Sequence, residues 1–460
     1  MPHNGFLSFL TDAAAALEAE FRSLPEFEAE LGASAEAMAQ VLEETAHRLG
    51  DNYPYFHPLY AGQMLKAPHP VARAAYALAM KLNPNNHALD GGRASSAMEI
   101  EAVREIAGMF GWKEFLGHLT SGGTFANLEA LWMAGQLEPG RRIVGSEQAH
   151  YTHGRISAVL KLEFTGVAAD ERGRMRLDAL EDELRKGAVG TVVATLGTTA
   201  MGAVDPLDEI VALAGRYGAR VHADAAYGGY FRLIADALDE PARRAYAAMD
   251  QADSIVIDPH KHGLQPYGCG CVLFRDPAVG RFYKHDSPYT YFTSKELHLG
   301  EISLECSRAG AAAVALWATQ RLLSLTTDGA FAEGLRKGRR AALELDRRVR
   351  EDGRFVALAA GPPELDIVVW ALHAADLRSS PVEARRVFDA CAARGLHLAL
   401  VQLPGSWFGA HDAAQSEASL TCLRSVLMKP EHEAWMGEIW ERLSAACDAI
   451  HGGSPRLKAR

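Results

Sequence analysis

A lysine stands between two histidines directly after a predicted buried strand. The stretch SIVIDPHKHG runs from Ser254 to Gly263 and places Lys261 between His260 and His262. An amine beside the low-dielectric end of a strand tends to have a depressed pKa, which frees it to attack a carbonyl carbon. The sequence therefore indicates a nucleophilic lysine, although lysines outside such settings are nearly always solvated surface charges.

A carboxylate ends a second apolar run. Asp224 closes the stretch ARVHAD, which has the composition of a buried strand. A carboxylate at a buried strand end is costly unless it has a partner. A salt bridge, a helix cap and a metal ligand are all compatible with this position, so Asp224 alone leaves its role open.

Three further stretches place polar residues just past predicted strands. A Gly-Gly pair precedes Thr124 in HLTSGGTFANLEAL, and free N–H groups at a helix start attract phosphate. His150 closes the run that begins RIVGSEQ, where an imidazole stacks on a flat ring or shuttles a proton. Thr199 follows Thr198 in ATLGTTAMG. Taken singly, each stretch reads more readily as an ordinary turn or a structural residue than as part of a ligand site, and His153 has no comparable support.

The five stretches together form one ordered set. A phosphate loop, a ring-stacking histidine, a threonine, a strand-end aspartate and a lysine are what a pyridoxal 5′-phosphate site requires. There the lysine binds the aldehyde as a Schiff base, and the aspartate keeps the pyridine nitrogen protonated. A metal site built from Asp258, His260 and His262 is the alternative. This alternative is disfavoured, because the spacing of the three residues suits an extended chain and the cationic Lys261 among them would repel a divalent ion.

The elements that carry these residues alternate between strand and helix. Thr191–Gly197 reads as an apolar strand, and Asp205 with Pro206 predicts a capped helix start. Further apolar runs end at Asp224 and Asp258. Strand, helix, strand with continuous apolar strands predicts an α/β fold with a mostly parallel sheet, whose ligand chemistry gathers at the carboxyl ends of the strands.

Three parts of the chain are expected. Residues 1–87 form an N-terminal helical segment with a substrate-side loop, because apolar residues recur there at three- and four-residue spacing before a proline-rich passage. Residues 88–325 form a large cofactor-binding domain. Residues 326–460 form a smaller C-terminal α+β domain, in which a charged helix precedes further strands and helices.

Composition excludes several classes of function. The 460 residues are 48% hydrophobic and 23% charged, with a formal net charge of −11. This acidic balance argues against nucleic acid or an anionic membrane as a partner. No apolar run reaches the roughly 18–20 residues of a membrane span, and the first residues lack the basic region of a secretory signal. The six scattered cysteines are expected to be reduced in a cytoplasmic protein.

The motifs resemble one family. TSGGTFANLEAL, SEQAHYTH, ATLGTTAMGAVDPL, HADAAYGGYF and DPHKHG look like the group II pyridoxal 5′-phosphate-dependent amino-acid decarboxylases, which include glutamate, aromatic-amino-acid, tyrosine and cysteine-sulfinate decarboxylases. The resemblance is clear over about residues 50–320. It implies an aspartate-aminotransferase-like fold (fold type I) and a homodimer with shared active sites.

The resemblance also implies roles by matched position. Lys261 would hold the cofactor aldehyde, Asp224 the pyridine nitrogen, and His150 one face of the ring. The other cofactor contacts would come from Gly123, Thr124, Thr199, Ala226, His260 and, across the dimer interface near Arg308, Ser307.

Substrate and proton are assigned in the same way. Arg424 would hold the substrate α-carboxylate, and Gln63 would contact the substrate side chain. Tyr291, with Tyr289 close behind, would return a proton after loss of CO2. Their presence favours decarboxylation over the oxidative, aldehyde-forming variant, which lacks that tyrosine.

Two positions depart from the family pattern. His262 stands where most members have tryptophan, which changes the polarity beside the lysine. Gly123 stands where serine is common, so the phosphate loop has one hydroxyl fewer.

The predicted function is therefore decarboxylation of an L-amino acid. Acid-specific relatives have a glutamine where this chain has Gln63, and aromatic-specific relatives have large rings where it has Ala61 and Gly62. These residues favour glutamate or aspartate over an aromatic substrate. Lys66 is either an additional cation for a distal carboxylate or, as is commoner for lysine, an exposed surface charge. The alternatives are a carbon–carbon lyase resembling sphingosine-phosphate lyase and a catalytically silent protein of the same fold. An NAD enzyme is disfavoured because no G-x-G-x-x-G follows an early strand.

Overall fold

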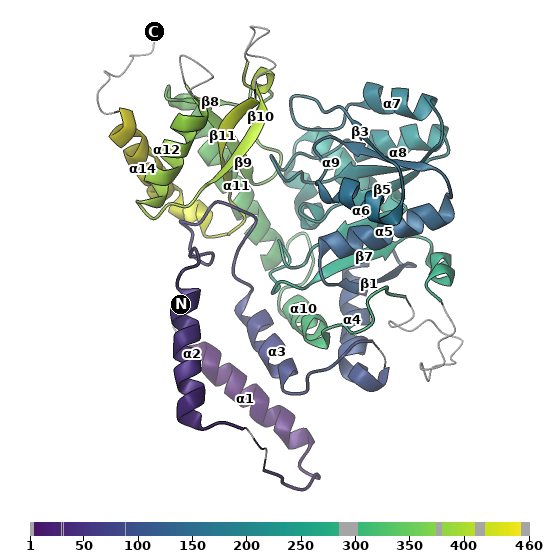
Figure 1. Cartoon of the computed structure of the whole chain (residues 1–460), viewed down its shortest axis with the longest axis vertical. Coiled ribbons are helices and arrows are strands. Elements are labelled where there is room, and N and C mark those ends of the chain that lie inside the picture. The colour runs from purple at the N-terminus through teal and green to yellow at the C-terminus, as the bar shows by residue number, and fades with distance from the viewer. Residues whose placement is uncertain are drawn as a thin grey trace.

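The fold is built around two sheets. The computed structural model describes residues 4–28, 30, 32–87, 89–284, 302–373, 380–409 and 419–451. In Figure 1 a unit with a seven-stranded sheet lies beside a unit with a four-stranded sheet, and two N-terminal helices extend away from both. The expected divisions at residues 87 and 325 fall between α3 and α4 and between α10 and α11.

The larger sheet is parallel except for one strand. Its order is β1-β7-β6-β5-β4-β2-β3, and only β7 runs antiparallel to its neighbours. Every residue of β4 is buried, as expected for a strand covered on both faces. The strands are β1 Leu116–Thr120, β2 Arg142–Ser146, β3 Phe164–Val167, β4 Val189–Thr195, β5 Arg220–Asp224, β6 Ser254–Ile257 and β7 Gly270–Phe274.

Helices connect and cover these strands. In α8, Leu207, Ile210, Leu213 and Ala214 form a buried stripe at helical spacing, and the helix packs on β4 and β5. Burying one such aliphatic side chain contributes about 1.5–3 kcal/mol. The helices are α4 Leu89–Met109, α5 Gly123–Leu137, α6 Thr152–Leu160, α7 Leu177–Arg185, α8 Leu207–Arg216, α9 Glu240–Ala247 and α10 Gly310–Leu322, with 3-10 turns at Gly229–Ala237, Ala248–Gln251 and Pro277–Phe282.

The smaller sheet is antiparallel, with the order β10-β11-β9-β8. Residues of β9 and β11 belong to the same apolar cluster as residues of the larger sheet, so the core continues from one unit into the other. The elements are α11 Ala330–Glu351, β8 Phe355–Ala357, β9 Ile367–Leu372, α12 Ser380–Ala392, β10 Ala399–Pro404, a 3-10 turn Gly405–Phe408, β11 Ser419–Val426 and α14 His432–His451.

The N-terminal helices carry exposed apolar side chains. They are α1 Asn4–Glu20, α2 Ala35–Leu49 and α3 Pro70–Met80. No residue of α2 is buried, and Val41, Leu42 and Leu49 are each more than 60% exposed. Among the described residues no helix is long and apolar enough to cross a membrane.

One predicted helix start is wrong. Pro206 is the N-cap of α8, and no side chain caps this helix. The Asp205 carboxylate instead accepts hydrogen bonds from the backbone N–H groups of Thr195 at 2.7 Å and Met175 at 2.6 Å. Asp205 therefore fixes the end of β4, and burial raises its pKa to about 7.

Candidate active site

A cavity of about 430 Å³ lies at the carboxyl ends of five parallel strands. Parallel strands end at the same edge of a sheet, so segments far apart in the sequence meet there. Its wall is formed by the segments that follow β1, β2, β4, β5 and β6, namely Ser121, Gly122, Gly123, Thr124, Phe125, Asn127, His150, Thr152, Thr195, Gly197, Thr199, Asp224, Ala226, Tyr227, Asp258, His260 and Lys261.

Asp224 presents an ionised carboxylate at the cavity wall although it is 96% buried. Burial alone would raise its pKa, but the hydrogen bond from His153 and the charges of His153, His222 and Lys261 outweigh burial and lower the pKa. His153 Nε2 donates to Asp224 Oδ2 at 2.7 Å, and the Ala226 N–H donates to Oδ1 at 3.2 Å. The site thus holds a negative charge ready for a cationic partner.

His150 is held in one tautomer. Its Nδ1 accepts a hydrogen bond from the Thr152 N–H at 3.4 Å and lies 2.7 Å from the Thr152 hydroxyl oxygen. Burial lowers the pKa of His150. The ring is therefore neutral with its proton on Nε2, and its orientation is set by the first residue of α6.

Lys261 lies opposite an acidic residue on its own turn. Its Nζ is 3.1 Å from Asp258 Oδ2, and His260 Nε2 is 3.6 Å from the same oxygen. The His260 Nδ1 donates to the carbonyl of Cys269 at 2.9 Å, which ties the turn to the start of β7. The amine is thus held at the cavity wall by an ion pair.

The start of α5 leaves no space for a side chain at Gly123. A Cβ added there would lie 2.4 Å from Asp258 Oδ2, so a serine would collide with the carboxylate that holds Lys261. The first N–H groups of a helix have no partner within it and attract an anion. Gly123, which departs from the family pattern, therefore leaves the space that the Asp258 carboxylate occupies.

Gly123→Ala is expected to destabilise the protein by about 1–3 kcal/mol, because the added carbon must displace a buried carboxylate. The displacement also moves the partner of Lys261, so we expect weaker cofactor binding. Thermal denaturation and cofactor titration measure the two effects. Gly437→Ala is the control, since nothing lies within 4 Å of its Cβ position in α14. Equal stability of the two variants would contradict the prediction.

His262 turns away from the cavity toward the four-stranded unit. Its Nδ1 donates to the carbonyl of Tyr227 at 3.0 Å, and its Nε2 lies 2.8 Å from Asp366 Oδ2. Asp366 Oδ1 accepts from the Tyr227 hydroxyl at 2.6 Å. Both His262 nitrogens face acceptors, so the ring is an imidazolium paired with a buried carboxylate. Asp258, His260 and His262 do not converge, and no metal-binding group of three ligands occurs among the described residues.

Asp366→Asn is expected to cost about 3–5 kcal/mol of unfolding free energy at neutral pH, because it leaves the His262 charge buried without its counter-ion. Although burial opposes it, the His262 charge lowers the pKa of Asp366. A lowered carboxyl pKa gives stability that is present above the ordinary carboxyl range and is lost as pH falls through the folded-state pKa. The difference in unfolding free energy between the variant and wild type should therefore become smaller as the pH falls. Denaturant unfolding across pH measures it, with the exposed Asp328→Asn as control.

Arg424 and Gln63 meet beside the cavity. The buried Arg424 donates from Nη2 to the Thr199 carbonyl at 2.6 Å, from Nε to the Ala200 carbonyl at 3.0 Å and from Nη1 to Gln63 Oε1 at 3.2 Å. Its described partners are thus neutral oxygens. Lys66 lies nearby with its Nζ 3.3 Å from the Met428 carbonyl, and burial lowers its pKa to about 8.

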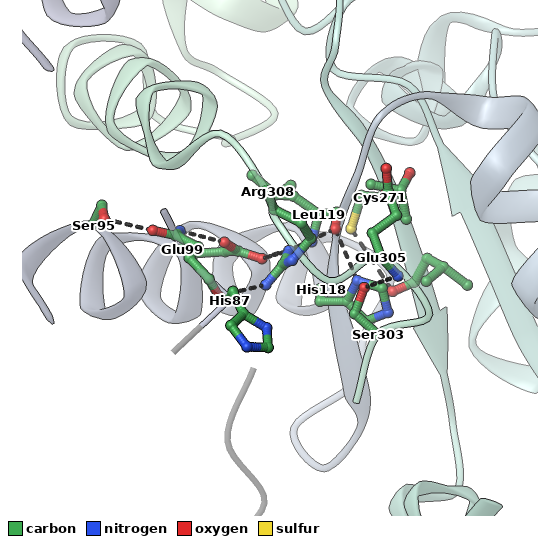
Figure 2. A network of polar contacts seen from close by, with 12 residues as sticks. His87, Ser95, Glu99, His118, Leu119, Cys271, Ser303, Glu305 and Arg308 are labelled. Carbon is green, nitrogen blue, oxygen red and sulfur yellow. Dashed lines mark hydrogen bonds and ion pairs between the residues drawn. The ribbon is translucent and has the colours of Figure 1, made fainter. Parts of the chain in front are cut away.

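Ser307 does not line the cavity of its own chain. It is exposed, and its hydroxyl accepts from Asn85 Nδ2 at 3.3 Å. Figure 2 shows its neighbour Arg308 between Glu99 and Leu119: Nη1 lies 2.6 Å from Glu99 Oε1 and 2.8 Å from the Leu119 carbonyl. Arg308 therefore bonds to α4 and β1 of its own chain, and the predicted contact of Ser307 with a partner's cofactor stays a prediction.

The structure brings together eight predicted residues and adds others. Gly123, Thr124, His150, Thr199, Asp224, Ala226, His260 and Lys261 all line the cavity. Tyr289 and Tyr291 lie outside the described residues.

Sequence reasoning missed His153, Thr152 and Asn127, and it considered Asp258 only as a metal ligand. The spacing of Asn127, one helical turn after Thr124, was a usable signal. No local signal marked the contact between His153 and Asp224.

These residues fit pyridoxal phosphate. A buried carboxylate has its charge directed to the cavity for a pyridinium nitrogen, and the start of α5 offers N–H groups to a phosphate. An amine for an aldehyde and an imidazole beside the same cavity complete the set.

Comparison with known proteins agrees with this chemistry. The model of the pyridoxal-dependent decarboxylase conserved domain matches residues 22–373. The L-tyrosine decarboxylase of Enterococcus faecium is 27% identical, over 65% of this chain and 65% of that protein, so the chain spans a little under two thirds of its length. A probable L-tyrosine/L-aspartate decarboxylase of Methanothrix thermoacetophila is 29% identical, over 82% of this chain and 90% of that protein.

A solved structure confirms the predicted fold class. Oryza sativa TDC, solved with PLP and tryptamine, superposes with a TM-score of 0.79 over 98% of this chain and 99% of that one, at 18% identity. The family model covers more than half of the 460 residues, and the cavity carries the residues that its cofactor requires. The chain belongs to the pyridoxal-dependent decarboxylase family.

Proposed function

We propose that this protein removes the α-carboxyl group of a small acidic L-amino acid, aspartate or glutamate, as CO2. The observation that carries the proposal is the single cavity in which Asp224, His150 and Lys261 face one another beside Arg424. Decarboxylases of tyrosine and aspartate among the relatives support the reaction class.

Each residue of the cavity would have a separate role in binding the cofactor or in moving a proton. Bound pyridoxal phosphate supplies an aldehyde that captures the substrate amine and a ring that withdraws electrons from the bond to be broken. Lys261 would hold the aldehyde carbon, and Asp224 would hold a proton on the ring nitrogen. The start of α5 would bind the phosphate, and His150, neutral with its proton on Nε2, would cover one ring face. Tyr291 would return a proton to the substrate α-carbon.

Arg424 would orient the substrate. Its guanidinium is buried beside the cavity and bonds to carbonyl oxygens and to Gln63 Oε1, which are weak competitors for a carboxylate. A carboxylate held there would lie next to the Thr199 segment of the cavity wall.

Space and charge support an acidic substrate over an aromatic one. A Cβ added to Gly62 would lie 2.8 Å from the Leu398 carbonyl oxygen, and Ala61 has no exposed surface, so neither of these two positions carries a ring, although that of Tyr60 lies beside Gly62. Gln63 is exposed and reaches Arg424. Lys66 adds a second cation close to the same segment.

We further propose a cytoplasmic homodimer with shared active sites. Exposed apolar side chains on α1 and α2 and the outward position of Ser307 support an interface with a second copy. Sedimentation of the purified protein measures the oligomeric state.

The test is a substrate panel. The protein is loaded with pyridoxal phosphate and incubated with each of the twenty amino acids while CO2, amine and oxygen are measured. CO2 and amine from aspartate or glutamate support the proposal. The same products from tyrosine alone would overturn the substrate class but keep the reaction. Oxygen consumption without amine, or no CO2 from any amino acid, would overturn the reaction itself.

A further inference from the structure

His153 lies behind the carboxylate that faces the cavity. It has no exposed surface and is the second residue of α6, three residues after His150. Its Nε2 is 2.7 Å from Asp224 Oδ2, and because a carboxylate only accepts, the imidazole must donate this hydrogen bond. The start of α6 thus places one histidine at the cavity wall and a second at the back of Asp224.

No other described side chain donates a hydrogen bond to Asp224. His222 lies on the same strand as Asp224, but its Nε2 bonds Asn127 Oδ1 and its Nδ1 bonds the Ser254 hydroxyl, both at 2.8 Å. Lys261 acts on Asp224 only through its charge, and no described hydrogen bond joins the neutral His150 to it. Besides the Ala226 N–H, the orientation of the carboxylate therefore depends on His153.

A buried carboxylate loses water as its hydrogen-bond partner and needs protein donors to stay ionised. A hydrogen bond to a charged group is stronger than one between neutral groups. His153 Nδ1 has no partner among the described residues. The hydrogen bond from Nε2 to Asp224 is therefore the only one that the imidazole ring makes there.

We propose that His153 is a positioning residue, which orients the Asp224 carboxylate and keeps it ionised so that Asp224 can hold a proton on the ring nitrogen of bound pyridoxal phosphate. The role in the reaction rests on the proposed function. The hydrogen bond between His153 and Asp224 is present without cofactor and is tested separately.

Two amide variants separate positioning from packing. The side chain of His153→Gln reaches far enough to donate to Asp224, whereas that of His153→Asn is one methylene shorter and does not. His118→Gln is the control, because His118 is equally buried and its Nε2 lies 3.0 Å from a buried carboxylate, Glu129, that does not line the cavity.

The first measurement needs no cofactor. Aspartate carboxyl carbons are labelled with carbon-13, and the Asp224 signal is assigned by its absence in Asp224→Asn. In His153→Asn the Asp224 carboxyl should titrate at least about one pH unit higher than in wild type, and in His153→Gln close to wild type. An unchanged titration in His153→Asn would overturn the proposal.

The second measurement uses bound cofactor. In His153→Asn the pH midpoint of the cofactor's visible absorbance should shift, and the dissociation constant of the cofactor should rise about tenfold. Both quantities should return to near their wild-type values in His153→Gln. A loss of thermal stability equal to that of His118→Gln, with no spectral change, would also overturn the proposal. A wild-type protein that fails to bind pyridoxal phosphate would overturn the proposed function, and the carboxyl titration would still decide the role of His153.

Discussion

Replacing Lys261 with alanine is expected to abolish the visible absorbance of the lysine-linked cofactor and to lower decarboxylation by on the order of 10⁴-fold or more. The amine is the group at the cavity wall that can bond covalently to the aldehyde, and its ion pair with Asp258 shows that it points into the site. Reduction of the loaded protein with borohydride, followed by peptide mass spectrometry, should find the cofactor on the peptide that contains Lys261.

The control is Lys113→Ala, which removes an exposed lysine before β1. It should retain both absorbance and activity. A Lys261→Ala protein that keeps the wild-type spectrum, or a reduced adduct on a different lysine, would remove Lys261 from the site.

Asp224→Asn is expected to lower kcat by about 10²–10³-fold while the cofactor remains bound. The substitution keeps the shape of the side chain but removes the charge that favours a proton on the ring nitrogen. The hydrogen bond with His153 remains possible for the amide oxygen, so folding should be little affected. Steady-state kinetics with a cofactor titration separate the rate effect from a binding effect.

Asp328→Asn serves again as the exposed control. Activity of Asp224→Asn within about twofold of wild type would show that no ring proton is held there. The His153→Asn variant should fall between wild type and Asp224→Asn, because it weakens the same charge without removing it.

The sequence was sufficient for the parts of the site that follow strand ends. Thr124, His150, Thr199, Asp224 and Lys261 each come shortly after an apolar run, and parallel strands bring such positions to one edge. The convergence of these five segments is therefore a consequence of topology, which the alternation of strand and helix predicted.

Contacts that depend on packing were beyond the sequence. Asp224 and His153 are 71 residues apart, and Asp366 and His262 are 104 residues apart, so no local pattern connects them. Asp205 has the sequence context of a helix cap, yet its carboxylate bonds to Thr195 and Met175 from two other segments. Such assignments depend on which backbone donors lie near a side chain after the chain has folded.

The buried pair of His262 and Asp366 restricts how this chain can be combined with its relatives. A hybrid protein that takes residues up to about 325 from one family member and the remainder from another would inherit only one half of the pair. If the other family member lacks a matching residue, one charged side chain would be buried without a counter-ion between the two units. Chimeras and ancestral reconstructions of this family should therefore exchange positions 227, 262 and 366 together.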